Sequence, residues 1–130
     1  MRRTILSING NKPFNYILKT VLSDKYKVHL AVNPVAGMRL IKEQPEVSLV
    51  VIDMDMFEKE AIDFVLHIKT SSIYNKPVIV LTSADLNLLT ARFSRIKVEE
   101  IFSKPFNPVL LLQQIDKMLM NDNFIIQMRP

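Results

Sequence analysis

Two short, almost purely apolar runs constrain the fold of this chain more than any other feature. Residues 47–52 read VSLVVI and residues 78–81 read VIVL. Runs of this length that are rich in β-branched residues are typical of parallel strands that are covered on both faces. An amphipathic helix would instead space its apolar residues three and four apart. The two runs therefore predict buried strands of a parallel sheet.

Strand-like and helix-like segments alternate through the rest of the chain. Three further strands are expected at residues 5–8, 28–32 and 101–102. Proline is preorganised for the first turn of a helix, so helices are expected to begin at Asn11-Lys12-Pro13, Asn33-Pro34 and Asn107-Pro108. Apolar residues at helical spacing mark the faces of these and two more helices: Phe14, Ile17, Leu18, Val21, Leu22, Val35, Met38, Ile41, Ala61, Ile62, Val65, Ile68, Leu86, Leu89, Phe93, Val109, Leu112, Ile115 and Leu119.

A strand followed by a helix, repeated five times, favours an α/β fold with one parallel sheet and helices on both faces. The chain has 130 residues, of which 48% are hydrophobic, and this suffices for one packed domain. We expect that domain to span residues 1–121. The last helix is expected to end at Asn121, and residues 122–130 are expected to form a C-terminal tail or the start of a linker.

Composition excludes several kinds of protein. The chain has no cysteine, so disulfide and thiolate chemistry are excluded. It lacks both the apolar run of a signal peptide and a stretch of the roughly 20 apolar residues that cross a bilayer, so we expect a cytoplasmic protein with no membrane contact. The net charge of +4 is mild, and the basic residues form no stripe with aromatics, so direct nucleic-acid binding is not expected.

Residues that are mostly polar follow the expected strands at the points where open α/β sheets bind ligands. These residues are Asn9 and Gly10, then Asp53 and Asp55, then Thr82 and Ser83, and finally Lys104. A carboxylate can attack phosphorus, a lysine and a divalent cation can offset negative charge, and a hydroxyl can donate to a phosphoryl oxygen. The sequence therefore predicts a site that binds or transfers a phosphoryl group.

Three segments together resemble a known family. VVIDMDM, PVIVLTSAD and IFSKPF, in this order and spacing, resemble the receiver domains of two-component response regulators over residues 4–121. The resemblance implies a flavodoxin-like doubly wound sheet with strand order 2-1-3-4-5. It also implies that Asp53 is the phosphoacceptor and that Lys104 contacts the acyl phosphate. Thr82 would supply the hydroxyl group that moves in response to phosphorylation. The step from Lys104 to Pro105 resembles a family feature that is often a cis peptide bond.

The first departure from the family concerns its metal ion. Receivers usually hold Mg²⁺ with a pair of acidic residues after the first strand, and this chain has Asn9 and Gly10 there. Mg²⁺ requires hard oxygen ligands in near-octahedral geometry, so we expect weak binding. The expected ligands are Asp53, the backbone carbonyl of Asp55 and, weakly, Asn9, with the Asp55 carboxylate as a substitute for the missing acids.

Two further departures concern side chains near the site. Ile101 stands three residues before Lys104, where receivers usually have a Tyr or Phe that acts as a rotameric switch, and Phe102 lies beside it. Ile101 cannot make the ring or hydroxyl movement of that switch. Phe57 stands where many receivers have proline.

The resemblance leaves two functions open. In the first, Asp53 takes a phosphoryl group from a histidine kinase or phosphotransfer protein, and the surface of the fourth helix, fifth strand and fifth helix signals to a downstream protein or domain. In the second, a degenerate receiver binds its partner without phosphorylation. In neither case is the protein expected to be an enzyme, apart from catalysing the transfer of a phosphoryl group to its own Asp53. The oligomeric state, monomer or homodimer, is left open.

Two other classes are weaker alternatives. Asp53 and Asp55 also resemble the first motif of haloacid-dehalogenase-type phosphatases, but that family needs a further acidic pair, and neither Asp116 nor Asp122 follows a strand. A flavin-binding flavodoxin needs a loop rich in Ser, Thr or Gly after its first strand, which SINGNKPF matches poorly.

Ser83 is expected only to cap the fourth helix.

Overall fold

The computed structural model of the chain describes residues 2–93 and 96–128, and the side chains of residues 2–93 and 96–120. Strands and helices alternate through these residues, as the sequence predicts. Their bounds are β1 (Thr4–Ile8), α1 (Lys12–Leu22), β2 (Lys27–Ala31), α2 (Pro34–Glu43), β3 (Val47–Asp53), α3 (Glu58–Thr70), β4 (Val78–Thr82), α4 (Leu86–Arg92), β5 (Glu100–Ser103) and α5 (Pro108–Met128).

The strands form one parallel sheet in the order β2-β1-β3-β4-β5, which confirms the predicted strand order. β3 is the middle strand and pairs with β1 on one side and β4 on the other. Because all the strands run parallel, their carboxyl ends meet at one edge of the sheet. Sheets of this kind bind ligands at that edge, where the strand order reverses.

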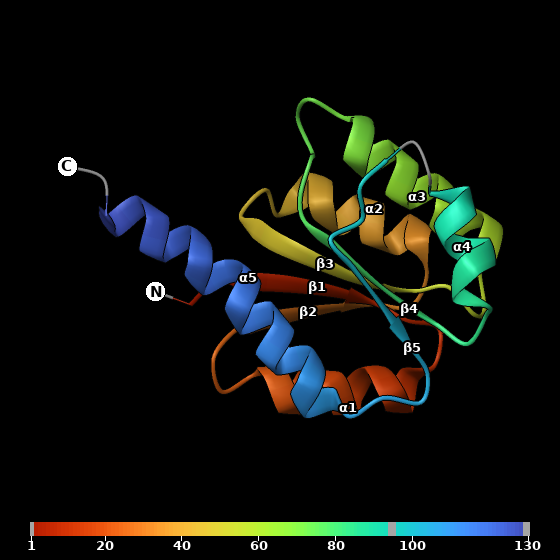
Figure 1. Cartoon of the computed structure of the whole chain (residues 1–130), viewed down its shortest axis with the longest axis horizontal. Coiled ribbons are helices and arrows are strands. Elements are labelled where there is room, and N and C mark those ends of the chain that lie inside the picture. Colours follow the sequence, from red (N-terminus) through yellow and green to blue (C-terminus); the bar gives the residue numbers. More distant parts are fainter. Residues whose placement is uncertain (1, 94–95, 129–130) are drawn as a thin grey trace.

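Helices cover both faces of the sheet, with α1 and α5 on one face and α2, α3 and α4 on the other (Figure 1). Alternate residues of β3 belong to different cores. Val50 and Ile52 pack beneath α2 and α3, whereas Leu49 and Val51 pack beneath α1 and α5. All four side chains are at most 1% exposed. Burial on both faces is the reason that this run is almost entirely apolar.

The predicted helix starts are confirmed. The side chain of Asn11 accepts a hydrogen bond from the Phe14 N–H at 3.0 Å, and that of Asn33 accepts one from the Ala36 N–H at 2.8 Å. Each asparagine therefore satisfies a backbone donor in the first turn of its helix. α5 begins at Pro108, as expected.

Four residues of the predicted apolar faces are exposed instead: Ile17, Val35, Leu86 and Val109 are 49%, 67%, 41% and 47% exposed. For Val35 the reason is the close approach of α2 to the sheet at Gly37. A Cβ atom at Gly37 would lie 2.3 Å from Cδ1 of Ile8, so the backbone can come this near only with glycine. The helix is thereby oriented with Gly37 inward and Val35 outward.

In α1 a polar residue takes an inward position that the apolar pattern did not predict. Asn15 is 2% exposed. Its Oδ1 accepts a hydrogen bond from the Ser7 hydroxyl at 2.5 Å, and its Nδ2 donates to the carbonyls of Ser7 at 3.2 Å and Ala31 at 3.4 Å. These bonds satisfy the buried amide and fix α1 against β1 and β2, while Ile17 lies on the outer side.

α5 extends farther than the sequence predicts. Its buried residues Leu111, Ile115 and Leu119 repeat every fourth position and pack against the sheet. The predicted helix end at Asn121 is wrong, because α5 continues to Met128 and its last turns project beyond the sheet (Figure 1). Asparagine has low helix propensity but does not terminate a helix by itself.

The predicted tail, residues 122–130, is therefore helical as far as the described backbone extends. Residues 129–130 and the side chains after Met120 lie outside the described part of the chain, so the predicted domain boundary at residue 121 stays a prediction. Among the described residues, no helix combines the length and the apolar character needed to cross a lipid bilayer.

Candidate functional site

Asp53 is the last residue of β3 and is 6% exposed. Its Oδ1 accepts a hydrogen bond from the Asp55 N–H at 2.9 Å, and its Oδ2 accepts one from Nδ2 of Asn9 at 3.2 Å. The carboxylate also forms an ion pair with Lys104. A buried carboxylate is stable only with such partners, and together they hold Asp53 in one orientation at the edge of the sheet.

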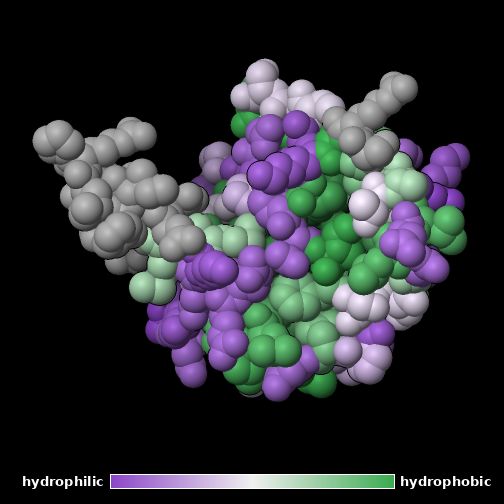
Figure 2. All heavy atoms as spheres, in the orientation of Figure 1, coloured by the Kyte–Doolittle hydropathy of each residue, from purple (hydrophilic) through white to green (hydrophobic). Residues whose placement is uncertain are grey.

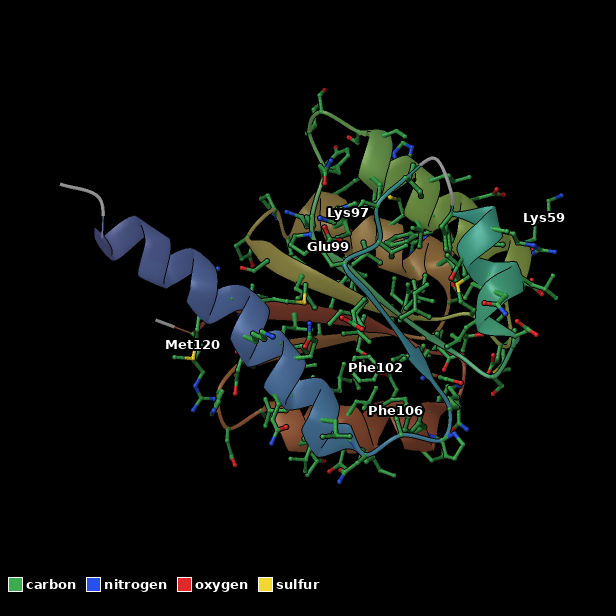
Figure 3. All side chains as sticks on the ribbon, viewed as in Figure 1. Lys59, Lys97, Glu99, Phe102, Phe106 and Met120 are labelled. Atoms are coloured by element: carbon green, nitrogen blue, oxygen red, sulfur yellow. The ribbon has the colours of Figure 1, made fainter. Side chains whose placement is uncertain are left out.

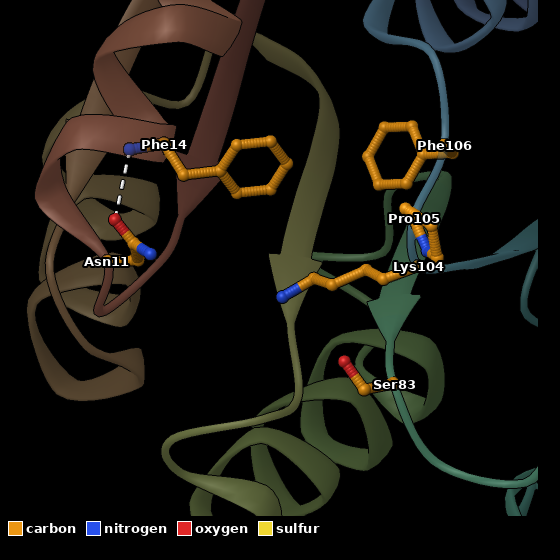
Figure 4. Close-up of a pocket in the computed structure, with 6 residues that line it drawn as sticks. All are labelled: Asn11, Phe14, Ser83, Lys104, Pro105 and Phe106. Atoms are coloured by element: carbon orange, nitrogen blue, oxygen red, sulfur yellow. Dashed lines mark hydrogen bonds between the residues drawn. The ribbon is translucent and has the colours of Figure 1, made fainter.

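Lys104 follows β5 directly and reaches across the edge of the sheet toward the end of β3 (Figure 4). Its backbone N–H donates to the carbonyl of Thr82 at 2.8 Å, and its peptide bond to Pro105 is cis, as expected. The ammonium contacts Asp53 and lies 2.9 Å from Oδ2 of Asp55. Burial lowers the pKa of Lys104, but hydrogen bonds to the two carboxylates and their charges raise it by more, so the amine stays protonated.

The Asp55 carboxylate binds the loop that follows β4. Its Oδ1 accepts the Ser83 N–H at 2.9 Å, and its Oδ2 accepts the Ser83 hydroxyl at 2.7 Å and the Lys104 ammonium at 2.9 Å. Burial raises the pKa of Asp55, but the hydrogen bonds from Ser83 and Lys104 and the charge of Lys104 lower it by more, so the net pKa lies below the usual 3.8. Asp55 is therefore an ionised member of the site.

Ser83 does not cap α4, and that prediction is wrong. Asp85 is the N-cap, and its Oδ1 accepts the N–H groups of Asn87 at 2.8 Å and Leu88 at 3.4 Å. Because Asp85 satisfies these donors, Ser83 is left to bind Asp55. Sequence reasoning missed this role, since a serine before a helix matches a cap and the contact joins two different loops.

Thr82 ends β4 beside β3, where Leu81 pairs with Asp53. It is fully buried, and its Oγ1 accepts a hydrogen bond from the Ala84 N–H at 2.9 Å. The three residues predicted to converge thus lie at the ends of neighbouring strands. Lys104 contacts Asp53 directly, whereas Thr82 joins the site through the backbone of Lys104.

The groups around Asp53 do not form a set of ligands that would hold Mg²⁺ tightly. Asn9 directs its amide nitrogen toward Asp53, and its Oδ1 accepts the Asn11 N–H at 2.8 Å. The ammonium of Lys104 contacts both carboxylates. In the part of the chain that the structure describes, no group of three or more His, Cys, Asp and Glu side chains could hold a metal ion. The weak site predicted from Asp53, Asp55 and Asn9 stays a prediction.

Gly10, which stands where the family resemblance predicts the second acidic residue, lies beneath the loop after β3. A Cβ atom there would meet Sδ of Met56 at 2.5 Å and Cε2 of Phe57 at 3.0 Å. Met56 itself is 62% exposed, so it covers Gly10 from the solvent side. The side chains of Met56 and Phe57 therefore fill space that an acidic side chain at position 10 would need. The two differences from the family pattern, at positions 10 and 57, thus occur together.

A pocket of about 500 Å³ opens beside Lys104 (Figure 4), lined by Asn11, Phe14, Ser83, Lys104, Pro105 and Phe106. The ammonium lies 5.5 Å from the centroid of the Phe14 ring, and the rings of Phe14 and Phe106 meet edge to face at 5.9 Å. The pocket therefore combines one cation with two aromatic walls. The apolar pattern predicts Phe14 as a core residue, and no sequence feature indicates a role for Phe106.

Ile101 stands at the position of the family's aromatic switch, and its neighbour Phe102 points to the other face of the sheet. Ile101 is half-buried and packs on the core beneath α2 and α3. Phe102, one residue later, points to the opposite face of the sheet, where its ring lies 5.4 Å from that of Phe106 (Figure 3). Successive residues of a strand face opposite sides, so Phe102 cannot take the place of an aromatic residue at position 101.

Comparisons with known proteins agree with this geometry. The family model of the response regulator receiver domain matches residues 5–116. The chain therefore belongs to the receiver domains of response regulators, which act in two-component signalling. Curated protein sequences give no match.

Solved structures show the same fold. The signal receiver domain of a LuxO repressor protein from Vibrio parahaemolyticus is 16% identical, with a TM-score of 0.78 over 100% of this chain and 99% of that one. The chemotaxis protein CheY4 from Vibrio cholerae is 18% identical, with a TM-score of 0.80 over 90% and 98%. A CheY-like receiver domain from Methanospirillum hungatei is 19% identical, with a TM-score of 0.80 over 95% and 98%.

Proposed function

We propose that this receiver domain accepts a phosphoryl group on Asp53 and signals through the surface formed by α4, β5 and α5. The observation that supports the proposal best is the placement of Asp53. It ends the central strand, is held by two hydrogen bonds and is paired with Lys104, while Thr82 ends the neighbouring strand. This is the arrangement that the receiver family uses as a phosphoacceptor site.

In the proposed reaction, a carboxylate oxygen of Asp53 forms a bond to phosphorus while the bond between phosphorus and the donor breaks, and the leaving group takes that electron pair. Lys104 offsets negative charge on the phosphoryl oxygens. Thr82 is the acceptor in its bond with Ala84, so its own O–H is left to donate to a phosphoryl oxygen. The domain accepts one group and is proposed to have no turnover of its own.

The donor and the output partner follow from the family in general terms. We propose a histidine kinase or phosphotransfer protein as donor and a separate protein or domain as target. Hydrophobic side chains gather over β5 and beside α4 (Figure 2), and Leu86 and Leu88 of α4 are 41% and 70% exposed. This apolar area supports α4 and β5 as the output surface, with a protein partner or a second copy of the chain as its occupant.

A second candidate function is a receiver that binds its partner without phosphorylation. It is favoured by the charge balance of the site, where Lys104 already contacts both carboxylates and the acidic pair is replaced by Asn9 and Gly10. With two carboxylates and one ammonium, the site carries less negative charge than it would with an added acidic pair, so it has less need of the divalent cation on which ordinary receivers depend.

Intact-protein mass spectrometry after incubation with acetyl phosphate separates the two candidates. Wild type and Asp53→Asn are compared with and without Mg²⁺. Phosphorylation at Asp53 predicts one phosphoryl adduct in the wild type and none in the variant. No adduct at high Mg²⁺ would reject the proposal in favour of the phosphorylation-independent receiver. Steady hydrolysis of a generic phosphate ester would instead support a phosphatase.

A further inference from the structure

One carboxylate connects the three loops that border the site. Asp55 lies between β3 and α3, Ser83 lies between β4 and α4, and Lys104 lies between β5 and α5. The Asp55 carboxylate accepts hydrogen bonds from the Ser83 N–H at 2.9 Å, the Ser83 hydroxyl at 2.7 Å and the Lys104 ammonium at 2.9 Å. Hydrogen bonds to an ionised group are stronger than neutral ones, so this carboxylate is a strong internal ligand for both loops.

Two of these three residues also contact Asp53. The Lys104 ammonium contacts Asp53 as well as Asp55, and the Asp55 N–H binds Oδ1 of Asp53. Ser83 directly follows Thr82, the hydroxyl residue of the site. Any tetrahedral anion placed at Asp53 therefore meets donors that already bind the Asp55 carboxylate. It also meets the negative charge of that carboxylate, and like charges repel at this range.

We infer that Asp55 is a positioning residue that keeps the site in a closed resting state: it occupies Lys104 and Ser83, and an anionic phosphoryl group must displace it from them. The inference rests on the proposed function for its phosphoryl group, but the closed state itself consists of bonds within the unphosphorylated protein. Displacement of Asp55 would release the loops after β4 and β5 together, because one carboxylate binds both.

Initial rates of phosphoryl uptake from acetyl phosphate test the inference in Asp55→Asn, Ser83→Ala and Glu58→Gln. Asp55→Asn removes the competing charge, so we expect phosphoryl uptake about fivefold faster than in the wild type. A change of this size corresponds to part of the free energy that one charge-assisted hydrogen bond contributes. Ser83→Ala removes one of the bonds and should give a smaller increase. Glu58→Gln is the matched control, since it removes a nearby charge whose partner is the exposed Arg92.

A second readout does not depend on covalent phosphorylation. Inorganic phosphate is titrated into the unphosphorylated wild type, Asp55→Asn and Glu58→Gln, and the Ser83 amide is followed by ¹⁵N NMR. We expect the Ser83 amide signal to move in Asp55→Asn before any phosphate is added, because its acceptor has lost its charge. Phosphate should then bind about fivefold more tightly to Asp55→Asn than to the other two proteins.

The two readouts separate the failure of the inference from the failure of the proposed function. If no protein forms an adduct but Asp55→Asn binds phosphate more tightly, phosphorylation fails and the closed state stands. If the wild type forms an adduct and Asp55→Asn reacts at the same rate or more slowly, the inference is overturned. An unchanged Ser83 amide signal in Asp55→Asn would also overturn it.

Discussion

At the scale of single residues, a lysine balances the charge of the buried acid. The side chain of Asp53 is 4% exposed and that of Lys104 is 22% exposed, so solvent screens this pair poorly. Asp55 adds a second negative charge at 2.9 Å from the same ammonium. The site therefore holds two carboxylates and one ammonium. A carboxylate at Gly10 or in place of Asn9 would have added charge that only a further cation could offset.

The pH dependence of stability should report the bonds of Asp55. Its pKa in the folded protein lies below its ordinary value, so its carboxylate stabilises the fold above about pH 4, and this contribution is lost as the pH falls through the folded pKa. Asp55→Asn should lower the free energy of unfolding near pH 7 by about 1 kcal/mol or less, because Asp55 is partly solvent-screened. Urea unfolding from pH 7 to pH 3 measures the difference between the two proteins. The difference should shrink at acid pH, and a constant difference would contradict the prediction.

At the scale of elements, the close contact between α2 and β1 decides how that helix is oriented. Periodicity alone predicted Val35 as an inward residue, because valine is apolar and follows the helix start. The backbone at Gly37 comes so near to Ile8 that this side of the helix faces the sheet instead. α1 shows the same effect at Asn15, whose buried hydrogen bonds compensate for its polarity. Local patterns locate a helix well, but contacts with the sheet set its rotation.

Gly37→Ala should destabilise the protein. The new methyl group would lie 2.3 Å from Cδ1 of Ile8, which is 2% exposed and enclosed by the core. We expect a net loss of about 1–2 kcal/mol in the free energy of unfolding, because overpacking outweighs the better helix propensity of alanine. Urea unfolding measures the loss.

Gly10→Ala is the matched control for this experiment. Its methyl group would lie 2.5 Å from Sδ of the exposed Met56, which can move aside, and 3.0 Å from Cε2 of Phe57, so the free energy of unfolding should change little. Equal losses in the two variants would show that the packing of Ile8 is not the cause.

At the scale of the whole molecule, the sheet is shared by two cores. The strands contribute alternate residues to the core beneath α1 and α5 and to the core beneath α2 and α3. Neither core can lose its strands without exposing the other. The candidate site lies at the carboxyl end of this shared sheet, so the stability of the site depends on both cores.

Variants in the two cores should therefore weaken one common unfolding transition. Ile5→Ala removes packing beneath α1 and α5, and Ile52→Ala removes packing beneath α2 and α3; both side chains are fully buried. Each should cost about 2–5 kcal/mol. Circular dichroism and tyrosine fluorescence should report the same midpoint in each variant. Separate midpoints for the two probes would show that the cores unfold independently.

The sequence by itself determined the order of the elements, the parallel sheet and the edge at which Asp53, Thr82 and Lys104 meet. These follow from local periodicity and from the rule that parallel strands end together. The tertiary structure decided which side chains bind each other there. Asp55 contacts Ser83 and Lys104, which lie 28 and 49 positions away in the chain. Such contacts depend on the directions of side chains from separate loops and on the rotation of helices against the sheet, and neither is encoded in a local pattern.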